Sequence, residues 1–120
     1  MARLEALLKG MPDERELRLV LEQLDPGPDH GLFTWLDQRN ASLAFWRGTA
    51  AVPIQVLLEL RGRGELCVLV TSREGMSSGA PLSRRVLEQV LQQLAHLLPE
   101  SPLIYRSDRD GAVEPSARRR

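Results

Sequence analysis

The sequence predicts an α+β protein in which an antiparallel sheet of four to five strands packs against N-terminal helices and one long C-terminal helix. Two observations lead to this prediction. Four strand-like segments follow one another between residues 32 and 71, with no helical segment between them. Segments with helical periodicity lie before and after this group, so strands and helices do not alternate as they do in parallel α/β folds.

The chain begins with two segments that favour helices. In residues 3–9, RLEALLK, three leucines share one helical face, and Gly10 follows as a suitable C-cap. In residues 13–24, apolar residues recur at positions i, i+3, i+4 and i+7, which is the helical period. Pro12 suits the start of this second helix. The segment DPGPDHG at 25–31 must end it, because prolines and glycines interrupt a helix.

Four strands are expected next. LFTWL (32–36) and SLAFW (42–46) form a hairpin across a short polar connection. PIQVLLEL (53–60) alternates, with Ile54, Val56, Leu58 and Leu60 on one face and Gln55, Leu57 and Glu59 on the other. LCVLVT (66–71) is apolar on both faces, which predicts a central strand.

The long C-terminal helix is expected at about 83–98, and a last strand at 102–106. Ser83 is a suitable N-cap for this helix, and a start at Pro81 fits the sequence as well. Residues 1–111 are interpreted as a single domain. The last nine residues, 112–120, are expected to be a flexible polar tail, because they contain little apolar material and end in three arginines.

The composition fits one globular domain and excludes several classes of protein. The 120 residues are 42% hydrophobic and 27% charged, and 16 basic residues balance 16 acidic ones. Nucleic-acid and membrane binders usually carry a basic surplus, so neither partner is expected. No segment approaches the roughly 20 apolar residues of a membrane span. The single cysteine excludes an internal disulfide and favours the cytoplasm.

The segment REGMSSGAPLSRR, residues 73–85, is the strongest candidate for a ligand site. A helix N-terminus presents unpaired N–H groups and partial positive charge, and two arginines there can converge on a bound anion. In the alternative interpretation, Arg84 pairs with Glu88, Arg85 lies in water, and the loop binds nothing. The segment lacks the lysine of a P-loop. The candidate ligand-binding residues are Ser77, Ser78, Gly79, Arg84 and Arg85.

No combination of residues predicts catalysis, a metal site or a cofactor. His30 and His96 each lack a second histidine or cysteine at metal-ligand spacing. Cys67 lies in the most apolar strand, which is typical of a buried structural thiol. Asp108 and Asp110 have the spacing of a calcium loop without the rest of its pattern. We therefore expect a protein that is not an enzyme, with no catalytic residues, no metal and no cofactor.

Surplus apolar residues predict a protein partner. The aromatic residues of the first hairpin either pack in the core or form part of an interface. Leu57, Cys67 and Leu69 lie on the sheet face opposite the main apolar face, and three helices are too few to cover both faces. A homodimer with a protein-binding surface is therefore expected. The candidate partner-binding residues are Phe33, Trp35, Trp46, Leu57 and Leu69.

One pattern spans residues 13–114 and contains the segments VPIQVLLEL, GELCVLV, LSRRVLEQVLQQLAHLL and LIYRSDRDGAV. With its order of elements, this pattern resembles the YbjN and type III secretion chaperone-like group of small α+β domains. The resemblance implies a dimeric cytoplasmic protein that binds another protein and has no catalytic residues. The balanced charge differs from the acidic character common among the secretion chaperones.

Two functions are therefore considered. The first is a non-enzymatic protein-binding domain, chaperone- or adaptor-like, that acts as a dimer. The alternative is a regulator that binds a small anionic ligand through the 73–85 loop and the N-terminus of the helix after it.

Overall fold

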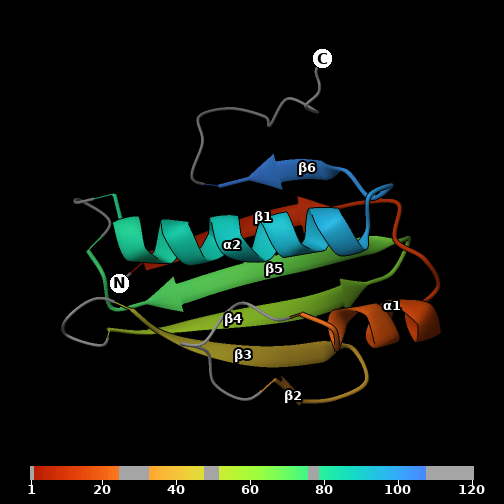
Figure 1. Ribbon diagram of the computed structural model, residues 1–120, viewed down its shortest axis with the longest axis horizontal. Coiled ribbons are helices and arrows are strands. Elements are labelled where there is room, and N and C mark those ends of the chain that lie inside the picture. The colour runs from red at the N-terminus through yellow and green to blue at the C-terminus, as the bar shows by residue number, and fades with distance from the viewer. Residues whose placement is uncertain (1, 25–32, 48–51, 76–78, 108–120) are drawn as a thin grey trace.

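The computed structural model describes residues 2–24, 33–47, 52–75 and 79–107. These residues form a six-stranded antiparallel sheet and two helices, as Figure 1 shows. The spatial order of the strands is β2-β3-β4-β5-β1-β6. The predicted α+β class with an antiparallel sheet is confirmed. The elements along the chain are β1 (Ala2–Leu8), α1 (Glu14–Leu21), β2 (Thr34–Trp35), β3 (Asn40–Arg47), β4 (Val52–Arg61), β5 (Glu65–Ser72), α2 (Pro81–Leu97) and β6 (Leu103–Arg106).

The first element is a strand, so the helix predicted over residues 3–9 is wrong. β1 lies between β5 and β6 and pairs with β5 along its whole length. Leu4 and Leu8 are four residues apart, a spacing that fits one helical face and one strand face equally well. Pairing decides between the two, because β5 satisfies one edge of the whole segment and β6 pairs with the other edge at Ala6–Leu8. The buried residues of β1 are Ala2, Leu4, Ala6 and Leu8.

The other predicted elements are present with shifted ends. α1 ends at Leu21, before the predicted end of its helix. β2 contains two residues, Thr34 and Trp35, of the strand predicted at 32–36. Residue 32 lies outside the described residues. α2 begins at Pro81 and has Ala80 as its N-cap, so Ser83 is inside the helix. The described residues therefore contain six strands and one N-terminal helix, where four to five strands and more than one N-terminal helix were expected. The tail at 112–120 lies outside them.

The hydrophobic core lies between the sheet and the two helices. The predicted alternation in β4 is correct, because Ile54, Val56 and Leu58 are at most 1% exposed and Gln55 between them is exposed. β5 lies between β4 and β1, as expected for a central strand. Burying one large apolar side chain contributes about 1.5–3 kcal/mol to folding. The helices contribute Leu17 and Leu21 from α1 and Val86, Leu87, Val90 and Leu94 from α2.

Both helices cover the same face of the sheet. Figure 1 looks down the shortest axis of the molecule, and α1 and α2 both lie in front of the strands. The molecule measures 39 × 33 × 21 Å. Its shortest dimension fits one sheet and one layer of helices, since a helix with side chains is about 10–12 Å across. The opposite face of the sheet is therefore left without a covering layer from the described residues.

Within the described residues, no helix has the length and apolar character needed to cross a membrane.

Candidate functional site

The sheet face turned away from the helices, called the open face here, has an apolar centre. Leu57 of β4 lies directly opposite Leu69 of β5 in the strand register. Leu7 of β1 lies opposite Cys67 on one side and Tyr105 of β6 on the other. Directly opposed residues of antiparallel strands have their side chains on the same face. The structure thus places the predicted partner-binding residues Leu57 and Leu69 together, partly exposed, while Tyr105 is 36% exposed.

Charged side chains lie next to these apolar residues, beside Cys67. Arg61 Nε lies 2.8 Å from Glu59 Oε1, and Arg61 Nη2 lies 3.8 Å from Glu5 Oε2. The Cys67 thiol donates a hydrogen bond to Glu5 Oε2 over 3.5 Å and is 3% exposed. Burial raises the pKa of Cys67 to about 11, an effect that Arg61 opposes and Glu5 reinforces. The thiol stays protonated at neutral pH, as expected of a structural cysteine.

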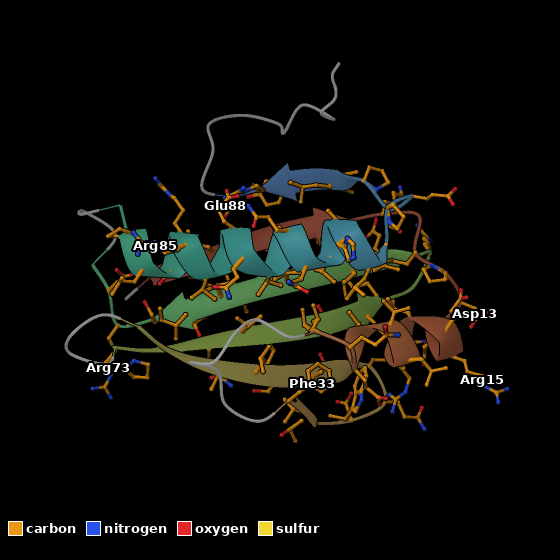
Figure 2. The ribbon with its side chains drawn as sticks, viewed as in Figure 1. Asp13, Arg15, Phe33, Arg73, Arg85 and Glu88 are labelled. Atoms are coloured by element: carbon orange, nitrogen blue, oxygen red, sulfur yellow. The ribbon has the colours of Figure 1, made fainter. Side chains whose placement is uncertain are left out.

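A hollow of about 550 Å³ lies at one end of the open face. It is at the end where β4 begins and β5 finishes, beyond the Leu57–Leu69 pair. Figure 2 shows Arg73 at this end of the sheet, far from Arg15 on α1. The open face therefore has an apolar centre and a hollow at one end. The residues lining the hollow include Ala44, Pro53, Gln55, Thr71 and Arg73.

The aromatic candidates Phe33 and Trp35 lie on the side of the helices. Their ring centroids are 5.5 Å apart with an interplanar angle of 82°, and both rings pack against the core. Trp35 Nε1 donates a hydrogen bond of 2.8 Å to Oε2 of Glu22, the C-cap residue of α1. The Arg18 guanidinium carbon lies 4.0 Å from the centroid of the Trp35 ring, a cation–π geometry. These contacts connect α1 to β2, so the two aromatic residues help to hold α1 against the core.

The fifth partner candidate, Trp46, pairs with Pro53 in the register of β3 and β4. Its side chain lies outside the part of the chain that the structure describes. The five candidates are therefore split between the two faces, and only Leu57 and Leu69 are shown together.

The predicted anion site at the start of α2 contains an anion supplied by the chain itself. Glu74 accepts the backbone N–H of Leu82 at Oε2 over 2.9 Å and that of Ser83 at Oε1 over 2.6 Å. Pro81, the first helical residue, has no N–H to satisfy. The Ser83 hydroxyl lies 2.6 Å from the hydroxyl of Ser72 at the end of β5. One carboxylate thus fills the position that the sequence left open for an external ligand.

The ionisation of Glu74 matches this capping role. Burial by itself would raise its pKa, but hydrogen bonds from the Ser83 side chain and from the N–H groups of Leu82 and Ser83 outweigh burial and lower it. The carboxylate is therefore ionised at neutral pH. Its negative charge complements the positive end of the α2 dipole and the two arginines of the first turns. An external anion is not needed to explain why arginines occur there.

The five anion-site candidates are only partly assembled in the structure. Arg84 and Arg85 are exposed on the first turns of α2, and Gly79 precedes them with a φ of 82°. Ser77 and Ser78 lie outside the described residues. Glu88, which the alternative interpretation assigns to Arg84, forms an ion pair with Arg106 of β6. Figure 2 shows Glu88 on the side of α2 that faces β6.

Sequence reasoning missed two polar residues that hold the helix layer in place. Arg106 is 3% exposed and connects the edge strand β6 to α2 through Glu88. Glu74 caps a helix that begins seven residues later in the chain. Neither contact has a local sequence signal, since a capping box is recognised by a spacing of three residues. Arginine in a terminal strand is normally expected to be exposed.

The chain matches no protein-family model and has no significant match among curated proteins. Among the described residues, no group of three or more His, Cys, Asp or Glu side chains could hold a metal ion. His96 is exposed on α2, and His30 lies outside the described residues.

Proposed function

We propose that the chain is a non-enzymatic protein-binding domain, chaperone- or adaptor-like, that acts as a homodimer. The observation that supports this function best is the group of partly exposed apolar residues on the open face, where Leu57 lies opposite Leu69 and Leu7 lies opposite Tyr105. A sheet with one uncovered face normally carries polar side chains there. Contiguous exposed apolar side chains, surrounded by charged ones, are typical of surfaces that bind another protein.

The six strands of the open face lie in the plane of the two longer dimensions of the molecule, which are 39 and 33 Å. A standard protein–protein interface needs about 800 Å² from each partner. The open face has an apolar centre and a polar rim, which is also the usual anatomy of such an interface. The resemblance to dimeric chaperone-like domains points to the same function, and the reduced cysteine is in keeping with the cytoplasm.

The alternative function, a regulator that binds a small anion at the 73–85 loop, has less support. The N–H groups of Leu82 and Ser83 already donate to Glu74, so an external anion would have to displace a carboxylate of the chain itself. That displacement leaves Glu74 without the hydrogen bonds that lower its pKa. The protein-binding function requires no such rearrangement.

Sedimentation equilibrium at micromolar concentrations tests the proposal. We expect a mass of twice the 13.5 kDa of one chain. Leu69→Glu places a charge at the centre of the open face and should give a monomer with an unchanged fold. The matched control is Leu19→Glu, because Leu19 is 60% exposed on α1 and lies on the helix side. A wild-type chain that remains monomeric throughout this range would contradict the proposal.

A further inference from the structure

The hollow at one end of the open face lies over a row of mostly small side chains. Ala44 of β3 pairs with Gln55 of β4, and Gln55 pairs with Thr71 of β5, so the three residues cross the sheet in line. All three line the hollow of about 550 Å³. Gln55 Nε2 donates a hydrogen bond of 3.1 Å to Ser42 Oγ on β3, which holds the longest side chain of the row to one side. The volume lies within the usual range of small-ligand pockets, about 300–1,000 Å³.

Two arginines lie at this end of the open face. Arg73 follows β5 directly and lines the hollow. Arg3 of β1 lies opposite Thr71 in the strand register, and Arg73 is two residues past Thr71. Diagonal neighbours of this kind are about 7–8 Å apart, a separation that long side chains bridge. Both arginines are exposed, and within the described part of the chain neither guanidinium makes a hydrogen bond or an ion pair.

Among the described residues, no acidic side chain pairs with these two arginines. Glu5 is two residues from Arg3, but its Oε2 lies 3.5 Å from Cys67 Sγ and 3.8 Å from Arg61 Nη2, toward the other end of the face. Glu74 follows Arg73 in the chain, and its carboxylate accepts N–H groups of the first turn of α2. An anion bound at the hollow would supply the negative charge that these carboxylates place elsewhere.

We infer that the hollow binds the C-terminal residue of a protein partner, with its carboxylate between Arg3 and Arg73 and its apolar side chain against Ala44 and Pro53. The inference rests on the proposed function and specifies the chemistry of the partner. The guanidinium groups suit a carboxylate, because their planar N–H groups donate two parallel hydrogen bonds to its two oxygens. The Thr71 hydroxyl, which has no side-chain partner among the described residues, is a further donor at this end.

The lining of the hollow favours a peptide terminus over other anions. Ala44 and Pro53 remove an aliphatic side chain from water, whereas a phosphate gains nothing from them. Gln55 Oε1 is an acceptor for a peptide N–H, which a simple fatty acid lacks. Capture of a C-terminal carboxylate is an established form of peptide recognition. The site lies beyond Leu57 and Leu69, so its occupant and a contact at these leucines use different parts of the open face.

An NMR titration of the isotope-labelled full chain with N-acetyl-leucyl-leucine tests the inference. The free acid and the C-terminal amide of this dipeptide are compared at neutral pH and constant ionic strength, because only the free acid carries the charge. The free acid should shift the backbone amide signals of Gln55, Thr71 and Arg73. It should bind about tenfold more tightly than the amide, the effect of losing a hydrogen bond to a charged group. Equal affinities of the two forms, or binding of neither, would overturn the inference.

Substitutions separate the charge of the hollow from its space. Arg73→Gln and Arg3→Gln should each weaken binding of the free acid about tenfold. Arg15→Gln, at an exposed arginine on α1 (Figure 2), is the matched control and should leave the affinity unchanged. Ala44→Leu fills the hollow and should abolish binding while both arginines remain, and Ala95→Leu, at an exposed alanine on α2, is its control.

Melting temperatures of all variants exclude a loss of fold. Full affinity for the free acid in Arg73→Gln or in Ala44→Leu would place the dipeptide elsewhere and overturn the inference.

Octanoate distinguishes the source of the carboxylate. It carries a carboxylate on an apolar chain without a peptide N–H for Gln55, so we expect it to bind more weakly than the dipeptide acid. Tighter binding of octanoate at the same residues would assign the hollow to a small apolar acid and overturn the partner inferred here.

The outcomes separate this inference from the proposed function. A monomeric chain that binds the dipeptide acid at Thr71 and Arg73 would contradict the homodimer and support the assignment of the hollow. A homodimer that Leu69→Glu disrupts, but that binds neither form of the dipeptide, would support the proposed function and overturn only the inference.

Discussion

The two faces of the sheet are built from the same strands and have different roles. In β4, Ile54, Val56 and Leu58 point to the helices and are at most 1% exposed, while Leu57 and Glu59 point to the open face and remain partly exposed. The core between sheet and helices therefore stabilises the monomer, and the open face is the surface to which we assign the proposed protein binding. Neighbouring residues of one strand can thus have nearly independent effects on folding and on association.

The largest expected contrast is between Leu58→Ala and Leu57→Ala. Leu58 is fully buried in the core, so its truncation should destabilise the monomer by about 2–5 kcal/mol. Leu57 is partly exposed in a single chain, so its truncation should cost less than about 1 kcal/mol at concentrations where the protein is monomeric. Urea unfolding of the dilute protein measures both values. Equal losses would show that the open face is already covered within one chain.

A smaller contrast is expected between the ion pairs of the two faces. Glu88→Gln removes the ion-pair partner of Arg106, which is 3% exposed on the helix side. We expect a loss of about 1–3 kcal/mol, below the value for a fully buried pair, because the Glu88 side chain is 43% exposed. Glu59→Gln is the matched control on the open face, where the side chains of Arg61 and Glu59 are 41% and 43% exposed. Such an exposed pair contributes at most about 1 kcal/mol.

The free energies of unfolding of both variants, measured in dilute protein, check this contrast. An equal effect at the two sites would mean that Arg106 does not depend on Glu88 to hold β6 against α2.

The sequence was most informative where one pattern fitted only one structure. The strict alternation in β4 predicted its two faces correctly, and the apolar character of β5 predicted its central position correctly. Residues 3–9 were ambiguous, because a segment of this length holds two helical turns and Leu4 and Leu8 satisfy both periods. Long-range pairing with β5 and β6 decides the structure of β1, and no local propensity contains that information.

The candidate sites show the same limit. The apolar surplus at Leu57 and Leu69 was visible in the sequence, since alternation alone places both on the second face of the sheet. The sequence did not show that a side chain of the chain itself caps the N-terminus of α2. Two arginines in its first turns suggested an external anion, but Glu74, two residues after β5, places its own carboxylate there. A contact of this kind depends on how β5 and α2 are positioned, which only the complete fold determines.

The smallest expected effect concerns this cap. Glu74→Ala removes the acceptor of two backbone N–H groups and should cost about 1 kcal/mol at pH 7, as for other lost helix caps. The pKa of Glu74 is lowered in the fold from an ordinary value of 4.5, so its ionised form stabilises the protein above that pH. This contribution is lost as the pH falls through the lowered pKa of the folded state. The difference between wild type and variant should therefore shrink progressively below pH 4.5.

The same variant distinguishes an internal cap from an external ligand site. In wild type the N–H groups of Leu82 and Ser83 are occupied, so inorganic phosphate at constant ionic strength should leave the melting temperature unchanged. In Glu74→Ala these groups are vacant at the positive end of a helix that carries two arginines, and phosphate should restore part of the lost stability. Arg84→Ala and Arg85→Ala in the Glu74→Ala background should abolish the restoration. A wild-type melting temperature that rises with phosphate would show instead that Glu74 yields its place to an external anion, and would favour the anion-binding function.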